Sequence, residues 1–223
     1  MHAISPEATD LRSLSLHDKP SRALGGISAA LLALVALGSC ASTDTAAAAT
    51  QEAEFDMEAM MADMMRLATP GQQHAELAKG AGKWDVSGKS YAGPGGEAMD
   101  MVATSEAEMI MGGRYRIEHF HSEFMGAPFD GMLIAGFDNL AGQHWTIWVD
   151  SMSTRYLADF GGMSDDDTLE THGTMRDSMT PDGRPSRTTV KHHNDDHYSM
   201  KMYDSLPDGT EWLAMEFEYR RAN

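Results

Sequence analysis

The residues with the clearest potential for chemistry are methionines and histidines. The chain of 223 residues contains 19 methionines and 10 histidines. Thioether sulfur, often together with imidazole, is a ligand set that Cu(I) prefers. Five methionines fall on one face of a predicted helix: Met57, Met60, Met61, Met64 and Met65. Because we expect this stripe to be buried against the rest of the domain as a soft apolar surface, we interpret it as packing and predict no metal site.

The histidines form two groups that could bind a metal or a haem. The tract "HHNDDH" at residues 192–197 spans a predicted hairpin turn. We expect its side chains to point to opposite faces there, so we interpret it as a solvated acidic hairpin. His119 and His121 alternate on one face of a predicted strand and, with His144, are candidate haem ligands. The chain has no haem-attachment motif, so haem stays an alternative and no cofactor is predicted.

Nucleophilic catalysis finds little support in the sequence. No Gly-x-Ser-x-Gly motif occurs, and the single cysteine, Cys40, lies at the end of an apolar leader. Asp150 and Ser151 are adjacent in a predicted strand, so their side chains point apart. The sequence identifies no catalytic residues, and we favour a binding or structural role over an enzyme.

From residue 83 onward the hydrophobic pattern has period two, which is typical of β-strands. Trp84 and Val86 alternate with Asp85 and Ser87, and short segments of this kind recur between turn sequences such as "AGPGG" and "LPDG". The predicted strands cover residues 83–91, 98–110, 113–124, 129–138, 143–151, 154–161, 167–175, 186–193, 196–204 and 210–220.

About ten short antiparallel strands without intervening helices predict an all-β fold. A meander of this length usually curls and closes, which also removes exposed edges, so we predict an up-and-down antiparallel β-barrel rather than a sandwich. A Met-rich helix precedes the strands, with Asp56 as its N-cap and Pro70 and Gly71 as its stop. A second short helical piece follows, with Leu77 turned inward. We expect the first helix to act as a lid or plug of the barrel.

The N-terminal part of the sequence predicts export and a lipid anchor. Residues 25–39 are apolar, small and uncharged, follow Lys19 and Arg22, and are shorter than the roughly 20 residues of a membrane span. The ending "LGSC" resembles the bacterial lipobox, which implies lipidation of Cys40. Ala41, where an Asp would signal inner-membrane retention, suggests the periplasmic face of the outer membrane. We therefore predict a lipoprotein signal peptide over residues 1–39, a flexible tether over 40–55 and one domain over 56–223.

The chain is strongly acidic. Its formal net charge is −17. Residues 1–39 contribute three acidic and three basic side chains, so the whole excess lies after the leader. Such a surface repels phosphate backbones, which argues against nucleic acid as a partner and favours solubility or cationic partners. We expect the membrane to be a partner only through the lipid anchor.

Several strings of the chain resemble a bacterial family, domain of unknown function 1579. They are "ATPGQQHAELAKGAGKWDV" at 68–86, "MIMGGRYR" at 109–116, "EFMGAPFDGMLIAGFDN" at 123–139, "WTIWVDSMST" at 145–154 and "LAMEFEYRR" at 213–221. The resemblance covers about residues 56–221 and implies a lipocalin-like (calycin) barrel without implying a reaction. Residues 82–84 are similar to the Gly-x-Trp of lipocalins, in which the Trp plugs the barrel floor.

The resemblance and the barrel fold together predict a cavity for a small hydrophobic or amphipathic ligand. In fatty-acid-binding relatives a buried Arg holds a ligand carboxylate, a role that Arg114 could take here unless it is tied to acidic residues at the barrel rim. The candidate ligand-binding residues are Trp84, Arg114, His119, Trp148, Tyr203 and Met215. Two alternatives stay open: a haem-binding or enzymatic barrel, and a structural envelope lipoprotein with a filled core.

Overall fold

The computed structural model of the protein describes residues 56–223, so the leader, Cys40 and the tether lie outside the described part. Two helices come first, α1 (Met57–Ala68) and α2 (Gln72–Ala78). Ten strands follow: β1 (Gly82–Tyr91), β2 (Ala98–Ile110), β3 (Tyr115–Phe124), β4 (Ala127–Asp138), β5 (Gln143–Asp150), β6 (Leu157–Met163), β7 (Thr168–Met175), β8 (Arg184–Asn194), β9 (His197–Ser205) and β10 (Glu211–Arg221). The bounds differ from the predicted ones by a few residues at most.

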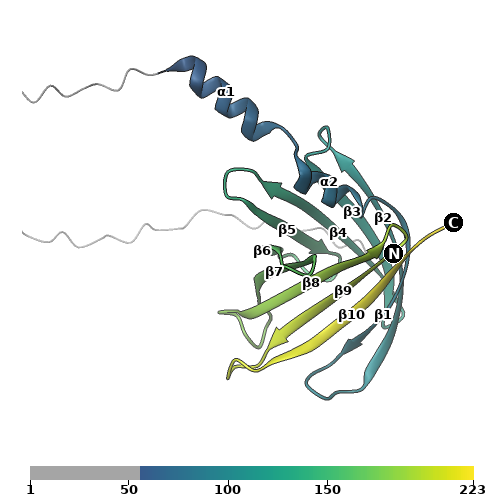
Figure 1. The fold of residues 1–223 in the computed structure, drawn as a ribbon. Helices are drawn as coiled ribbons and strands as arrows, with labels where there is room; N and C mark the ends of the chain where they lie inside the picture. The colour runs from purple at the N-terminus through teal and green to yellow at the C-terminus, as the bar shows by residue number, and fades with distance from the viewer. Residues whose placement is uncertain (1–55) are drawn as a thin grey trace, which may run out of the picture. The chain divides into compact units, whose positions relative to one another are not determined.

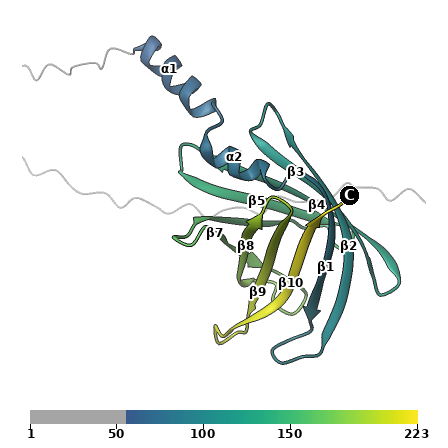
Figure 2. The ribbon, with the colours of Figure 1, turned by 45° about the vertical axis from the view of Figure 1, so that its right-hand side comes forward.

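The strands form one closed antiparallel barrel (Figure 1). Each strand pairs with its neighbours in the sequence, and β1 pairs with β10 to close the ring (Figure 2). The prediction of an up-and-down barrel is therefore confirmed, and the sandwich is excluded. Consecutive strands can pair in this way because the turns supply positive φ angles, as at Gly112 and Gly113 with φ of 67° and 83°.

Side-chain alternation decides what each strand places inside the barrel. In β1 the side chains of Trp84 and Val86 are buried in the interior, while Lys83 and Asp85 are exposed on the outside. The buried core lies on β1, β2, β3, β9 and β10 and consists of Trp84, Val86, Ala103, Phe120, Tyr198, Phe217 and Tyr219. Aromatic side chains thus fill one side of the interior.

A β-bulge interrupts this alternation in β10. The sequence pattern predicts that Leu213, Met215, Phe217 and Tyr219 share one face. The register of β10 against β9 shifts between Leu213 and Met215, so Leu213 pairs with Tyr203 whereas Met215 pairs with Met202. Because one extra residue reverses the alternation, Leu213 leaves the interior face that the other three residues share.

The methionine stripe of α1 is exposed, so the prediction that it is buried against the domain is wrong. Met57, Met61, Met64 and Met65 are each more than half exposed, and α1 has no buried residue. Asp56 caps α1 as predicted, accepting a hydrogen bond from the backbone N–H of Ala59 at 2.9 Å. None of the helices within residues 56–223 is long and apolar enough to span a membrane.

The second helix, rather than the first, packs on the barrel. α2 lies against β3 and β4 (Figure 1) and buries His74 and Leu77, which confirms the inward turn of Leu77. The end of α1 is joined to the β4–β5 turn by Asn139, whose Nδ2 donates to the carbonyl oxygens of Leu67 at 2.8 Å and Thr69 at 2.9 Å. The packing against the barrel that was predicted for the first helix is thus made by α2.

The exposure of the methionines leads to a direct prediction. Replacing Met61 and Met64 together with glutamine should change the free energy of unfolding by less than about 0.5 kcal/mol, because exposed positions without a special contact contribute little. Urea unfolding followed by circular dichroism measures this. A loss above about 2 kcal/mol would show that the stripe is buried after all.

Candidate functional site

The candidate site is the barrel interior, and one end of it is closed by Trp84. We call this end the α2 end, because β1 begins there directly after α2. Trp84 is 1% exposed, and its Nε1 donates to the carbonyl oxygen of Gly80 at 3.0 Å. The guanidinium of Arg221 lies over the indole at 4.3 Å, and Nη1 of Arg221 donates to the carbonyl oxygen of Ala81 at 3.1 Å. The Trp84 indole also meets Tyr198 edge to face at 4.8 Å. These contacts give Trp84 the role of a floor.

A buried polar cluster lies beside this floor. Glu118, which is buried, accepts a hydrogen bond from Ser105 Oγ at 2.7 Å and pairs with Arg116 Nη2 at 3.2 Å. His192 stacks at a tilt on Tyr198, 5.0 Å between ring centroids. Burial, followed by the positive charge of Arg116, lowers the pKa of His192 to about 4, so this imidazole is neutral at pH 7. The carboxylate of Glu118 is thus paired within the cluster, which supports the floor, whereas Nε of Arg116 is buried without a hydrogen-bond partner.

The part of the interior away from the floor has an apolar wall that solvent partly reaches. Six partly buried side chains pack here against the core: Met101, Phe129, Trp148, Val190, Met200 and Met215. Trp148 meets Phe120 edge to face at 6.0 Å and stacks with Phe129 at 6.5 Å. Its ring lies over Gly131, where a Cβ would come within 2.2 Å of it. Aromatic and thioether groups of this kind suit an apolar ligand of variable shape.

A polar row crosses the interior on the other side, over β6, β7 and β8. Asp159 and Ser186 are both buried, and both pair in register with Gly173. Because Gly173 has no side chain, the Asp159 carboxyl leans over it, with Oδ1 only 1.8 Å from where a Cβ would stand. Oδ2 of Asp159 lies 3.3 Å from Thr188 Oγ1, whereas Oδ1 of Asp159 and Oγ of Ser186 have no hydrogen-bond partner.

This polar row is unusual because buried polar atoms normally have partners. Asp159 is only 4% exposed, and burial raises the pKa of its carboxyl above the usual range. An unpaired buried carboxyl oxygen costs free energy, so its presence in the interior requires an explanation. Oδ1 of Asp159 is therefore the interior atom best suited to accept a hydrogen bond from a bound molecule.

An ion-pair network ties together β8, β9 and the loop before β8. Nε and Nη2 of Arg184 contact the two carboxylate oxygens of Asp204 at 2.6 and 2.7 Å, which is a bidentate pair. Nη1 of Arg184 also contacts Asp177 Oδ2 at 2.5 Å, in the loop between β7 and β8. Hydrogen bonds from Arg184 and from Thr180 hold the pKa of Asp177 well below its usual range. The network fixes a loop that leads into the polar side of the barrel.

The comparison with known families now adds to this geometry. The model of the family described as "Protein of unknown function (DUF1579)" matches residues 69–221. This chain belongs to the DUF1579 family. The match includes α2 and all ten strands of the described part, and it begins after α1. A search among curated proteins gives no match.

Three of the predicted ligand-binding residues lie in the interior of the DUF1579 barrel, and three do not. Trp84, Trp148 and Met215 line it. Arg114 lies in the β2–β3 turn, where its Nη1 donates to the carbonyl oxygen of Met111 at 2.9 Å, so neither the buried role nor the acidic rim partner is observed. His119 is exposed, because it is out of phase with the buried Glu118 and Phe120. Tyr203 lies on the outside, under the guanidinium of Arg187 at 3.9 Å, so it is no cavity wall.

The three candidate haem ligands of the DUF1579 chain do not converge. His119 and His121 are exposed on the outside of β3, and Nδ1 of His121 contacts Asp130 Oδ1 at 2.7 Å. His144 is buried, and its Nε2 lies 3.0 Å from Gln73 Oε1. Burial and the nearby His74 lower the pKa of His144. The histidines therefore provide no shared axial position.

Some interior residues that are missing from the list of candidates follow from the alternation pattern of their strand, and others do not. Arg116 and Glu118 are in phase with Phe120 in β3, so alternation places them inside once the face of Phe120 is known. Asp159 and Ser186 lie in strands rich in small and polar residues, where hydrophobic alternation is weak. Only the pairing of β6, β7 and β8 brings them together.

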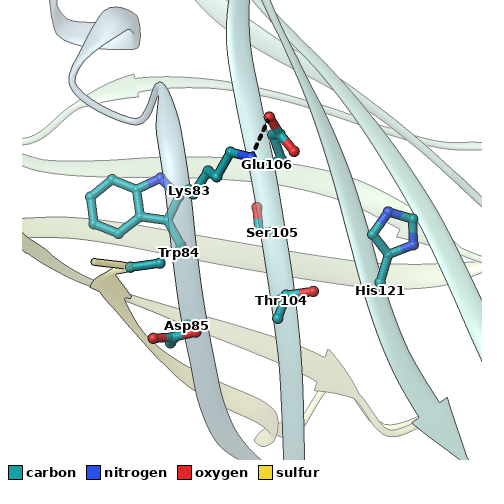
Figure 3. Close-up of a pocket in the computed structure, with 8 residues that line it drawn as sticks. Lys83, Trp84, Asp85, Thr104, Ser105, Glu106 and His121 are labelled. Carbon is teal, nitrogen blue, oxygen red and sulfur yellow. Dashed lines mark ion pairs between the residues drawn. The ribbon is translucent and has the colours of Figure 1, made fainter.

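A depression on the outer wall of the DUF1579 barrel is a weaker candidate (Figure 3). It has a volume of about 230 Å³, and its lining includes Lys83, Asp85, Thr104, Glu106 and His121. Figure 3 shows Lys83 reaching across to Glu106, while His121 stands on the next strand; the Lys83–Glu106 distance is 3.3 Å. Both members of this pair are mostly exposed, so the pair contributes little. The two buried residues of the lining, Trp84 and Ser105, already donate their hydrogen bonds to Gly80 and Glu118.

Proposed function

We propose that the DUF1579 barrel binds one small amphipathic molecule in its interior. The observation that supports this most strongly is the buried, unpartnered Oδ1 of Asp159 inside a barrel whose other side is lined by Trp148 and methionines. Ligand sites are commonly apolar surfaces with a few polar groups that fix orientation. The apolar part of the molecule would lie against Trp148, and its polar head would donate a hydrogen bond to Asp159.

The chemistry of the polar row narrows the class of ligand. Both carboxyl oxygens of Asp159 accept hydrogen bonds when the group is ionised, and Ser186 Oγ can donate or accept. A head group with an N–H or O–H donor satisfies the free oxygen of Asp159. A carboxylate head would place a second negative charge beside a carboxyl that is already poorly solvated, so fatty acids fit this site less well than amines or alcohols.

A neutral fluorescent probe tests the proposal even though the natural ligand is unidentified. N-phenyl-1-naphthylamine has apolar rings and a single N–H donor. We expect it to bind the purified full chain with one-to-one stoichiometry and to quench tryptophan fluorescence. Replacing Asp159 with leucine should weaken binding about tenfold, which is the effect of one lost hydrogen bond to a buried acceptor.

The control for this substitution is Asp182→Leu, at an exposed turn position. It changes the chain's charge equally and should leave probe binding unaltered. Circular dichroism confirms that both variants keep the β-sheet spectrum. Equal probe affinity in Asp159→Leu and Asp182→Leu would contradict the assigned site, and failure of the probe, dodecylamine and dodecanol to bind the unaltered chain would contradict the proposed function.

We propose further that the barrel acts at the cell envelope, held by a lipid on Cys40. The support is the position of the single cysteine directly after the apolar leader. Several acyl chains together hold a protein firmly at a bilayer, whereas one chain alone binds marginally. Replacing Cys40 with serine should move the protein from the membrane pellet to the soluble fraction and abolish incorporation of labelled palmitate. If the serine variant still pellets with membranes after a high-salt wash, the anchor is elsewhere.

A further inference from the structure

Two histidines of the β8–β9 hairpin and one glutamate of β10 come together on the outer wall of the barrel. Each of His193, His197 and Glu218 offers one ligand atom, and these atoms all lie within 4.8 Å of one another. The rings of His193 and His197 are 4.5 Å apart between centroids. Nε2 of His197 contacts Oε2 of Glu218 at 2.5 Å.

The sequence pattern predicts that the histidines of this hairpin point to opposite faces. The structure separates only His192 from the other two in this way. His192 points into the barrel and stacks at a tilt on Tyr198. The pairing of β8 with β9 has an irregularity between His192 and Asn194, with His193 in between. His193 and His197 then share the outer face, where β10 adds Glu218. A third ligand from a different hairpin could not be anticipated from the tract "HHNDDH" alone.

Contacts around the three side chains tie the hairpin to β9 and β10. His193 Nε2 contacts Ser199 Oγ at 2.9 Å, and Ser199 pairs in register with Glu218. Arg221 fixes the hairpin turn to β10, because its side chain contacts the carbonyl oxygen of Asp195 and Oδ1 of Asp196. Sites on strands with supported side chains keep their geometry better than sites on loose loops.

We infer that His193, His197 and Glu218 form a binding site for a divalent transition-metal ion of the Zn²⁺ class. Two imidazoles and one carboxylate are a common ligand set for such ions, and they leave a coordination position for water or another ligand. Ligands around a tetrahedral ion with bonds of about 2 Å lie about 3.3 Å apart, which side-chain rotation can reach from the observed separations. The net charge of −17 further favours cations near the surface.

The site is separate from the proposed ligand site, because it lies on the outer wall whereas Asp159 lies inside. A negative result for the metal site therefore does not contradict the interior ligand site, and the reverse also holds. Its three side chains are exposed or partly exposed, so substitution there should not unfold the chain. Variants at these positions can thus be compared directly with the unaltered protein.

Zinc titration of the full chain, purified without a histidine tag, tests the inference. The readout is competition with a fluorescent chelator, together with the visible absorption bands of Co²⁺ added in place of Zn²⁺. We expect one ion to bind per chain at this site. His193→Ala should weaken binding by at least about 100-fold, more than the usual loss for an outer partner of a metal ligand, and Glu218→Gln by roughly tenfold.

The chain itself offers a matched control. His172 also faces a glutamate on the outer wall, with Nε2 3.0 Å from Glu170 Oε1, but these two residues belong to no described cluster of three potential ligands. His172→Ala should leave zinc affinity unchanged. The inference is overturned if His193→Ala and His172→Ala bind zinc equally well, or if the unaltered chain neither binds Zn²⁺ nor shows Co²⁺ bands.

Discussion

Replacing Trp84 with alanine is expected to lower the free energy of unfolding by about 4 kcal/mol, in the range of large-to-small substitutions of buried aromatic residues. Trp84 is 1% exposed and is the largest fully buried side chain of the described part. Alanine would leave a cavity beside Tyr198, remove the hydrogen bond to Gly80 and deprive Arg221 of the ring that it covers. The floor of the barrel would lose the indole ring that closes it.

Urea unfolding followed by circular dichroism measures this loss. The more conservative Trp84→Phe keeps an aromatic ring in the core but has no N–H group, so it should lose less than the alanine variant and more than an exposed substitution. A loss below about 1 kcal/mol for Trp84→Ala would contradict the assignment of this residue to a tightly packed floor.

The second large effect is expected at Arg184, which is the hub of an ion-pair network. Its bidentate partner Asp204 has a side chain only 13% exposed. Removing one partner of a fully buried pair costs about 3–5 kcal/mol, because the remaining charge is left unpaired. Since this pair is only partly buried, we expect Arg184→Ala to lose about 2 kcal/mol. Arg184→Lys should recover little of it, because lysine cannot form the bidentate contact.

The exposed pair of Arg66 and Asp63 on α1 provides the control for Arg184. The two side chains are 67% and 57% exposed, so Arg66→Ala should cost less than about 0.5 kcal/mol. The pH dependence gives a second check. Because the pKa of Asp177 is lowered in the folded chain, the stability from its pairing is present above the usual Asp range and is lost as the pH falls. A difference between Arg184→Ala and the unaltered chain that stays constant down to strongly acidic pH would contradict this network.

The strands and the closed barrel could be predicted because alternation and turn chemistry are local properties. Trp84 and Val86 alternate with exposed charged or polar residues, and most changes of direction have a glycine or asparagine in the turn. The floor role of Trp84 was implied by the resemblance of residues 82–84 to the Gly-x-Trp of lipocalins, and the burial of Trp84 at the start of β1 agrees with it. The strand predictions succeeded because their information lay within one strand and its neighbouring turn.

The predictions that were wrong depended on irregularities or on contacts between distant strands. Tyr203 was a candidate ligand-binding residue of the interior, yet it is out of phase with Met200 and Met202 and lies under Arg187 on the outside. The methionines of α1 have a periodicity that fits burial, but periodicity does not identify a partner surface, and they are exposed. Asp159 and Ser186 come together only because β6, β7 and β8 pair in register, so the pattern of a single strand could not predict this polar row.

The central claim is that the interior of the barrel holds a small molecule, and native mass spectrometry of the full chain purified from cells tests it most directly. The same sample measured under denaturing conditions gives the mass of the chain with any covalent lipid. We expect the native mass to exceed the denatured mass by one small amphipathic molecule, and this difference to disappear in Asp159→Leu. Identical native and denatured masses, with no uptake of added amines or alcohols, would show a filled structural barrel, and a bound haem with its Soret band would show a different ligand class; either result would contradict the account.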